Sequence, residues 1–149
     1  MCYHAMGHTI ILDTSVFTAA LLRAGAGASR QTLRLCLEEQ CYPLMGDKLF
    51  LEFESVLGRE ELFKNCPINA QEREELFAAF AAVCRWVPVH YLWRPNLPDE
   101  GDNHVLELAV AGGAEAVVTH NVRDFRRAEL QYPEVQILTP AEFLKKVRV

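Results

Sequence analysis

The sequence predicts an α/β protein, and two observations carry that prediction. Short apolar runs of strand length alternate along the chain with longer stretches whose apolar residues follow helical spacing. Capping and turn residues stand at many of the joints between them. Strands that alternate with helices form a largely parallel sheet with helices on both faces. We therefore predict a three-layer α/β/α sandwich around a central, mainly parallel sheet of about five strands, in one domain over residues 1–149.

Composition and charge exclude several classes of protein. Apolar residues make up 50% of the chain, which is too many for a disordered protein with a net charge of only −5. The apolar runs are far shorter than the ~20 residues of a membrane span, and residues 1–9 lack the apolar segment of a secretory signal. Five cysteines without a C-x-x-C pair indicate reduced, mostly buried thiols in a cytoplasmic protein. An acidic protein binds a polyanion only where its acids are neutralised locally.

The first elements follow from the order of apolar and capping residues. The apolar run Thr9–Leu12 predicts a buried strand, and residues 15–22 predict a helix directly after it. The glycine-rich segment 23–28 predicts a loop. Ser29 is then suited to cap a helix that runs to about residue 40.

The middle of the chain continues the alternation. Residues 41–45 predict a second short strand. Asp47 is suited to cap the next helix, which has a clear apolar face. Asn69 followed by Glu72 resembles a capping box and opens a long helix that runs to about residue 85.

The next segment contains two more strands with a helix between them. Residues 86–90 predict the third strand, and residues 91–101, which contain two prolines, predict a loop. Residues 102–110 predict a helix that ends at the glycine pair 112–113. Residues 116–119 predict the fourth strand.

The last elements are a loop, a strand and a helix. Residues 120–127 predict a polar loop, and residues 135–138 predict the fifth strand. Thr139, Pro140 and Glu142 have the types favoured at the N-cap, first and third positions of a helix, so they predict a terminal helix.

Acidic side chains gather where an open α/β sheet carries its chemistry, at the carboxyl ends of the strands. Asp13 ends the first strand, Asp102 opens the helix after the third, and Asp124 follows the fourth. Glu52 lies in the middle of a helix, where a carboxylate has no capping role. Clustered carboxylates repel one another, so such a group is typical of a site that binds divalent cations.

Each acid also has an ordinary structural interpretation, and these alternatives stay open at this point. Asp13 and Asp102 are suited to cap the helices that follow them. Asp124 is suited to a turn, and Glu52 to a solvated helix surface. Asp99 is interpreted as a loop charge that lies close enough to Asp102 to support a site.

Four segments together resemble those of a PIN domain, a metal-dependent nuclease domain found in many toxins of prokaryotic toxin–antitoxin pairs. The resemblance extends from residue 10 to about residue 144. The segments are I-I-L-D-T-S-V with Asp13, L-E-F-E-S-V-L with Glu52, D-N-H-V-L-E-L-A with Asp102, and V-V-T-H-N-V-R-D-F with Asn121 and Asp124.

The resemblance implies an endoribonuclease that depends on Mg²⁺ or Mn²⁺, with RNA as substrate and an antitoxin protein as a further partner. A bound cation would also make an acidic cleft able to accept phosphate. The catalytic and metal-binding residues that it implies are Asp13, Glu52, Asp102 and Asp124, with Thr14, Ser15, Asp99 and Asn121 in support. Many relatives have Asp where this chain has Asn121, and a neutral amide weakens a second metal position.

Three further expectations concern partners. Arg23, Arg30, Arg123 and Arg126 are candidates for binding RNA, with solvated surface as the alternative interpretation. A homodimer is expected with the apolar helical segment 77–84 at its interface, although burial in the core explains that segment equally well, and no membrane partner is expected. The alternative function is a catalytically weak PIN-like module that binds nucleic acid or protein, which Asn121 slightly favours.

Overall fold

Five parallel strands form one sheet in the computed structural model, in the order β3-β2-β1-β4-β5. The structure describes residues 7–22, 27–89, 103–129 and 132–147. The strands are β1 (Thr9–Leu12), β2 (Tyr42–Met45), β3 (Arg85–Trp86), β4 (Ala116–Val118) and β5 (Gln136–Leu138). The predicted parallel sheet of five strands is confirmed, with β1 at its centre.

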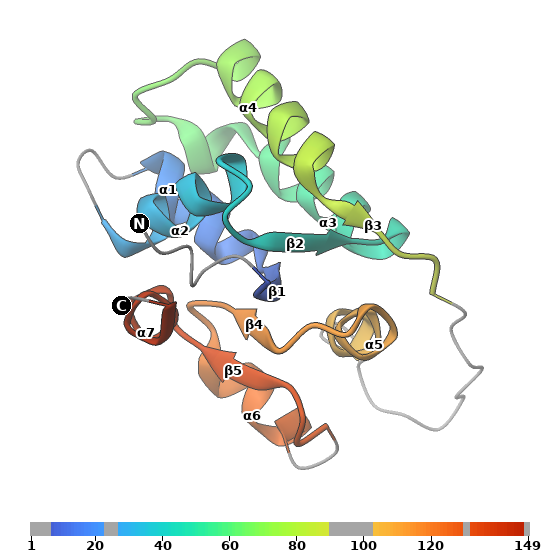
Figure 1. Ribbon diagram of the computed structural model, residues 1–149. Helices are drawn as coiled ribbons and strands as arrows, with labels where there is room; N and C mark the ends of the chain where they lie inside the picture. The colour runs from blue at the N-terminus through green and yellow to red at the C-terminus, as the bar shows by residue number, and fades with distance from the viewer. Residues whose placement is uncertain (1–6, 23–26, 90–102, 130–131, 148–149) are drawn as a thin grey trace.

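Helices cover both faces of this sheet. They are α1 (Thr14–Leu22), α2 (Ala28–Leu37), α3 (Asp47–Leu57), η1 (Glu60–Phe63, a short 3₁₀ turn), α4 (Ala70–Val83), α5 (Asn103–Gly112), α6 (Val122–Glu129) and α7 (Pro140–Val147). Right-handed crossovers from β1 to β2 to β3 place α1–α4 on one face, and the crossovers back to β4 and β5 place α5 and α6 on the other. Helix α7, red in Figure 1, packs against α2 and therefore belongs to the face covered by α1–α4. The α/β/α prediction is therefore confirmed.

An aromatic cluster fills the core between β1 and the helices α3 and α4. Phe17 on α1 packs edge-on against Phe53 and Phe77, at 5.6 and 5.9 Å between ring centroids. Phe80 closes the cluster at 5.5 Å from Phe17. Phe77, Phe80 and Cys84 are buried, so the largest apolar side chains of segment 77–84 belong to the core, whereas Ala78, Ala79 and Ala82 are exposed. The homodimer stays a prediction without an assigned surface.

Two of the predicted helix starts are confirmed. Asn69 and Glu72 form a reciprocal capping box at α4, with side-chain-to-backbone bonds of 2.8 and 2.9 Å. Thr139 and Glu142 do the same at α7, where Pro140 is the first helical residue. Each box satisfies backbone N–H groups that the helix cannot pair internally.

Two other predicted caps are wrong. The residue before α2 is Gly27, and Ser29 lies inside the helix with its hydroxyl 2.6 Å from His120 Nε2. The residue before α3 is Gly46, and Asp47 is the first helical residue, with its negative charge near the positive end of the helix dipole. In both cases a glycine adopts the extended backbone that the cap position requires.

The third strand is shorter than predicted, and the loop predicted after the fourth strand is a helix. Strand β3 contains only Arg85–Trp86, because Pro88 has no N–H with which to extend the ladder. Residues 122–129 form α6, in which Phe125 is a buried apolar anchor. Five of the eight residues of α6 are charged, so the segment resembles a polar loop in composition. His90 and the loop predicted for residues 91–101 lie outside the described residues.

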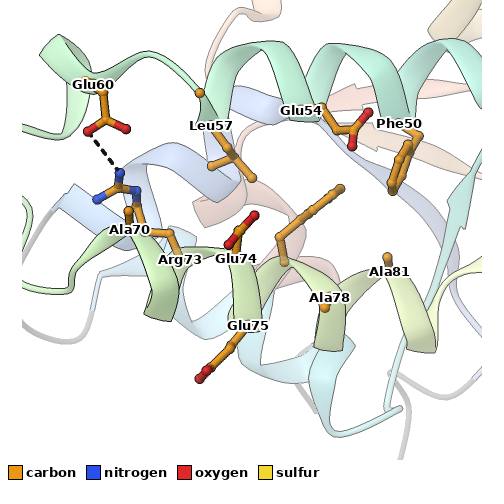
Figure 2. A pocket seen from close by; sticks show the side chains of 12 residues that line it. Phe50, Glu54, Leu57, Glu60, Ala70, Arg73, Glu74, Glu75, Ala78 and Ala81 are labelled. Carbon is orange, nitrogen blue, oxygen red and sulfur yellow. Dashed lines mark ion pairs between the residues drawn. The ribbon is translucent and has the colours of Figure 1, made fainter.

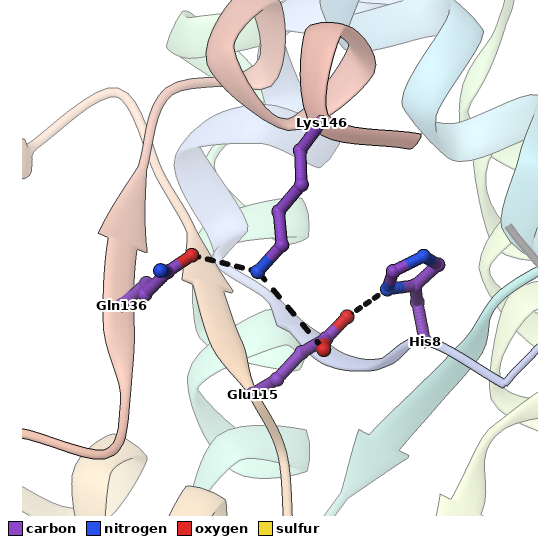
Figure 3. A network of polar contacts seen from close by, with 4 residues as sticks. All are labelled: His8, Glu115, Gln136 and Lys146. Atoms are coloured by element: carbon purple, nitrogen blue, oxygen red, sulfur yellow. Dashed lines mark hydrogen bonds and ion pairs between the residues drawn. The ribbon is translucent and has the colours of Figure 1, made fainter. Parts of the chain in front are cut away.

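A polar network ties the opposite, amino-terminal edge of the sheet together (Figure 3). Glu115, which precedes β4, contacts the His8 ring through Nδ1 and lies 4.0 Å from Lys146 Nζ on α7. Lys146 also donates a hydrogen bond of 2.7 Å to Gln136 on β5. The network therefore joins β4, β5 and α7 at the end of the sheet away from Asp13.

Candidate functional site

Asp13 stands at the point where the strand order of the sheet reverses. The chain moves outward from β1 to β2 and β3, then returns to place β4 on the other side of β1. Residues Leu12 and Val118 are register partners, so Asp13 and Thr119 are the first residues beyond two adjacent parallel strands. Open α/β sheets bind their ligands in this position, outside the carboxyl ends of the strands at the switch in topology.

Two hydroxyl groups hold the Asp13 carboxylate from one side. Ser15 Oγ donates to Asp13 Oδ2 at 2.6 Å, and Thr119 Oγ1 donates to the same oxygen at 2.8 Å. Each hydroxyl in turn accepts a backbone N–H, that of His120 at 3.0 Å and that of Asn121 at 2.9 Å respectively. These chains of hydrogen bonds fix the direction of both donors, so the carboxylate has one defined orientation in a site where it is only 5% exposed.

The capping interpretation of Asp13 is not what the described hydrogen bonds favour. The backbone carbonyl of Asp13 accepts from Val16 and Phe17 at the start of α1. Within the described chain, the carboxylate bonds to Ser15 and Thr119 hydroxyls instead of to backbone N–H groups of the helix. The side chain is therefore available for a role other than capping the start of α1.

Glu52 faces α5 from the middle of α3. Its Oε1 lies 3.8 Å from His104 Nε2, and its Oε2 is buried without a hydrogen-bond partner. Asp124 is exposed in the first turn of α6, where its backbone N–H bonds to the Asn121 carbonyl. Asp99 and Asp102 lie outside the described residues. Within the described ranges, no three His, Cys, Asp or Glu side chains form a group that could hold a metal.

Several site residues differ from what sequence reasoning selected. Of the two polar residues after Asp13, Ser15 contacts the carboxylate, whereas Thr14 is a half-buried first residue of α1. Thr119 contacts Asp13 as closely as Ser15 does, and the sequence analysis did not select it. The register between β1 and β4 is what brings Thr119 to Asp13, and a single sequence does not reveal register.

The arginines that were candidates for RNA binding differ in their exposure. Arg30 is half-buried and donates to the Ala20 carbonyl from Nε and from a terminal nitrogen, at 3.3 and 3.0 Å, so it ties α2 to α1. Arg123 is exposed on α6, next to Asp124. Arg23 and the side chain of Arg126 lie outside the described residues.

A groove of about 860 Å³ lies between α3 and α4, apart from the Asp13 site (Figure 2). Its apolar lining includes Phe50, Leu57 and Phe77, and its acidic lining comprises Glu54, Glu60, Glu74 and Glu75. Arg73 is the single basic lining residue, and it lies 3.8 Å from a carboxylate oxygen of Glu60. The excess of acids makes this groove unsuited to a phosphate backbone.

Sequence comparison agrees with this architecture. The family model described as PIN domain matches residues 9–123, from the start of β1 into the first turn of α6. The chain belongs to the PIN domain family. PIN domains are generally nucleases that act on nucleic acid and typically use divalent metal ions. No curated protein matches the chain by sequence, and in the part of the chain that is described no helix has the length and apolar character needed to cross a membrane.

Proposed function

We propose that this PIN domain is a divalent-metal-dependent endoribonuclease. The observation that carries the proposal is the Asp13 carboxylate, held at Oδ2 by two hydroxyls at the switch in strand order. A carboxylate that is oriented by hydrogen bonds to one oxygen is prepared to bind a cation through the other. Ordinary burial of an acid would not require two donors that are themselves fixed by backbone N–H groups.

The proposed ligand set fits a divalent ion by its chemistry. Asp13 and Glu52 offer the carboxylate oxygens that Mg²⁺ and Mn²⁺ prefer, and Glu52 Oε2 is a buried acceptor without a donor. Asp102 and Asp124 complete the proposed set. When bound, the ion supplies an activated water and neutralises charge on the scissile phosphate.

The chain's own residues have distinct proposed roles. Ser15 and Thr119 orient Asp13, and the exposed Arg123 offers a cation to the RNA backbone close to Asp124. Asn121 contributes its backbone N–H to the Thr119 hydroxyl. Its neutral side chain provides less attraction for a second ion than an aspartate would.

Cleavage of a fluorogenic RNA oligonucleotide tests this proposal. The wild-type protein is expected to cleave with Mn²⁺ or Mg²⁺, to stop in excess EDTA, and to lose most activity as Asp13→Asn. Glu54→Gln, on the same helix as Glu52 but in the α3–α4 groove, is the matched control and is expected to cleave normally. Full activity in EDTA or in Asp13→Asn would overturn the metal mechanism. RNA binding without cleavage would favour the weak binding module instead.

We further propose that the nuclease is a cytoplasmic toxin whose antitoxin binds the α3–α4 groove. The four described cysteines form no disulfide, which supports a reducing compartment. The apolar lining and acidic rim of the groove complement a basic amphipathic helix. A second copy of the same acidic surface would be repelled, so a basic partner is favoured over self-association through this groove.

The product of the reading frame immediately upstream is the probe for this partner. It is expected to bind the purified protein, inhibit RNA cleavage, and lose affinity when Glu74 and Glu75 are both replaced by Lys. Glu134→Lys, an exposed acid outside the groove, is the control and should leave the affinity unchanged. Equal binding by the wild-type protein, the double Lys variant and Glu134→Lys would show that the partner does not bind this groove. No binding by any of them would contradict the toxin role.

A further inference from the structure

The contact between α3 and α5 leaves two polar atoms without partners. Glu52 Oε2 and His104 Nδ1 are both buried with no hydrogen bond. The nearest atoms of the two side chains, Oε1 and Nε2, are 3.8 Å apart, which is beyond hydrogen-bond distance. A buried polar group without a partner costs about 1–3 kcal/mol. Oε2 and Nδ1 lack partners, and Oε1 and Nε2, the closest atoms of the two side chains, are also too far apart to share a hydrogen bond.

The spacing of the pair suits a metal ion better than it suits a hydrogen bond. Two atoms that bind the same divalent ion at about 2.1 Å each lie roughly 3–4 Å apart, according to the angle between them. The separation of 3.8 Å between Glu52 Oε1 and His104 Nε2 falls in that range, so these two atoms, and not the partnerless Oε2 and Nδ1, are the ones placed for an ion. Carboxylate oxygen and neutral imidazole nitrogen are both metal ligands. The His104 side chain is 13% exposed and the Glu52 side chain 33%, so both side chains keep some contact with solvent.

We propose that His104 binds the metal ion of this PIN domain together with Glu52. The inference rests on the proposed metal-dependent function, and it extends the ligand set, which so far contained only carboxylates. Mg²⁺ takes oxygen ligands, whereas an imidazole favours first-row transition ions. The pair therefore selects Mn²⁺ over Mg²⁺ as the resident ion. Among the other described histidines, His8 pairs with Glu115, and His120 contacts Ser29.

Pulsed electron paramagnetic resonance of Mn²⁺ bound to the full chain tests this directly. A ¹⁴N coupling from imidazole is expected in the wild-type protein and is expected to disappear in His104→Gln. It should persist in His120→Gln, which changes a residue whose backbone N–H bonds to Ser15, and in His8→Gln, which changes a residue at the opposite edge of the sheet. Calorimetry should show Mn²⁺ affinity about tenfold or more weaker in His104→Gln, with a smaller change for Mg²⁺.

The outcomes separate this inference from the proposed function. Mn²⁺ binding without nitrogen coupling in the wild-type protein would overturn the role of His104 and leave the carboxylate site standing. If the coupling were lost in His120→Gln but kept in His104→Gln, the nitrogen ligand would be His120, and the inference would be overturned. Absence of any binding of Mn²⁺ or Mg²⁺ would overturn the proposed function with it. If His104→Gln does not fold, ¹⁵N-histidine labelling shows whether the coupled nitrogen belongs to a histidine, and replacement of each of the other four histidines in turn then identifies His104 by elimination.

Discussion

Thr119 Oγ1 donates a hydrogen bond of 2.8 Å to Asp13 Oδ2, across 106 residues of sequence. The two residues meet because β1 and β4 are adjacent and in register at Leu12 and Val118. Thr119 is fully buried, and its hydroxyl also accepts the backbone N–H of Asn121. One hydroxyl thus joins the carboxylate to the start of α6.

Replacement of Thr119 by Val tests the structural value of that hydroxyl. The change keeps the shape of the side chain but removes a donor to Asp13 and the acceptor for the Asn121 N–H. Buried groups left without partners cost about 1–3 kcal/mol, so we expect the free energy of unfolding in urea to fall by about that amount. Thr119→Ser retains the hydroxyl, so its free energy of unfolding should fall by less. Equal stability of the Val and wild-type proteins would contradict the hydrogen-bond assignment.

Metal binding should raise the melting temperature through Asp13. An ion that binds only the folded protein stabilises it by about 2.7 kcal/mol at a hundredfold excess over its Kd. We expect differential scanning fluorimetry to show a rise with Mn²⁺ for wild type and little or none for Asp13→Asn. Glu54→Gln should retain the full rise. If Glu54→Gln lost the rise and Asp13→Asn kept it, the site would lie elsewhere.

Asn121→Asp should strengthen a second metal position. The added carboxylate supplies the charge that the amide lacks, and Asp13, its neighbour through Thr119, is already oriented. Calorimetric titration with Mn²⁺ is expected to show one tight ion in the wild-type protein and tighter binding of a second in the variant. Two equally tight ions in the wild-type protein would refute the proposed effect of Asn121.

Buried thiols should make the protein lose stability at alkaline pH. Burial raises the pKa of Cys41 and of Cys84 from the ordinary 9.0 to about 12. Between those values the unfolded chain releases thiol protons that the folded protein keeps, so the unfolded state binds fewer protons. The free energy of unfolding therefore falls as pH rises from 9 towards 12, by up to about 1.4 kcal/mol per pH unit for each thiol.

The thiol contribution can be separated from that of other groups by mutation. Cys41→Ala and Cys84→Ala should each flatten the decline in stability measured by urea unfolding over this pH range, even though both lose some packing. Cys66, which is only partly buried, provides the comparison as Cys66→Ala. An identical slope in all four proteins would show that thiol ionisation does not drive the alkaline loss.

The sequence predicted the strands and most helices because each has a local signature. The capping pair Asn69 and Glu72 predicts the start of α4 from four consecutive residues, and the apolar run of β1 is bounded by polar residues. Helix α6 is harder to recognise, because five of its eight residues are charged; its described apolar contacts with the core are Phe125 and the partly buried Val122. Local patterns therefore suffice for elements that carry their own stop and start signals.

The candidate site was predicted less completely, because its contacts cross the sheet. Asp13 could be selected because it ends the first strand, and Glu52 because a carboxylate in the middle of a helix has no capping role. Thr119 and His104 could not, because one depends on strand register and the other on the packing of α3 against α5. Pairings of that kind are properties of the assembled layers and not of any single segment.

The distance in sequence between Asp13 and Thr119 has a consequence for how the protein is made. Ribosomes add roughly 5–20 residues per second, so β4 emerges on the order of 5–20 s after Asp13, given the separation of 106 residues. During that interval the nascent chain contains the carboxylate without Thr119 to orient it. The Asp13 carboxylate therefore gains its described orientation only after β4 has been synthesised and has paired with β1.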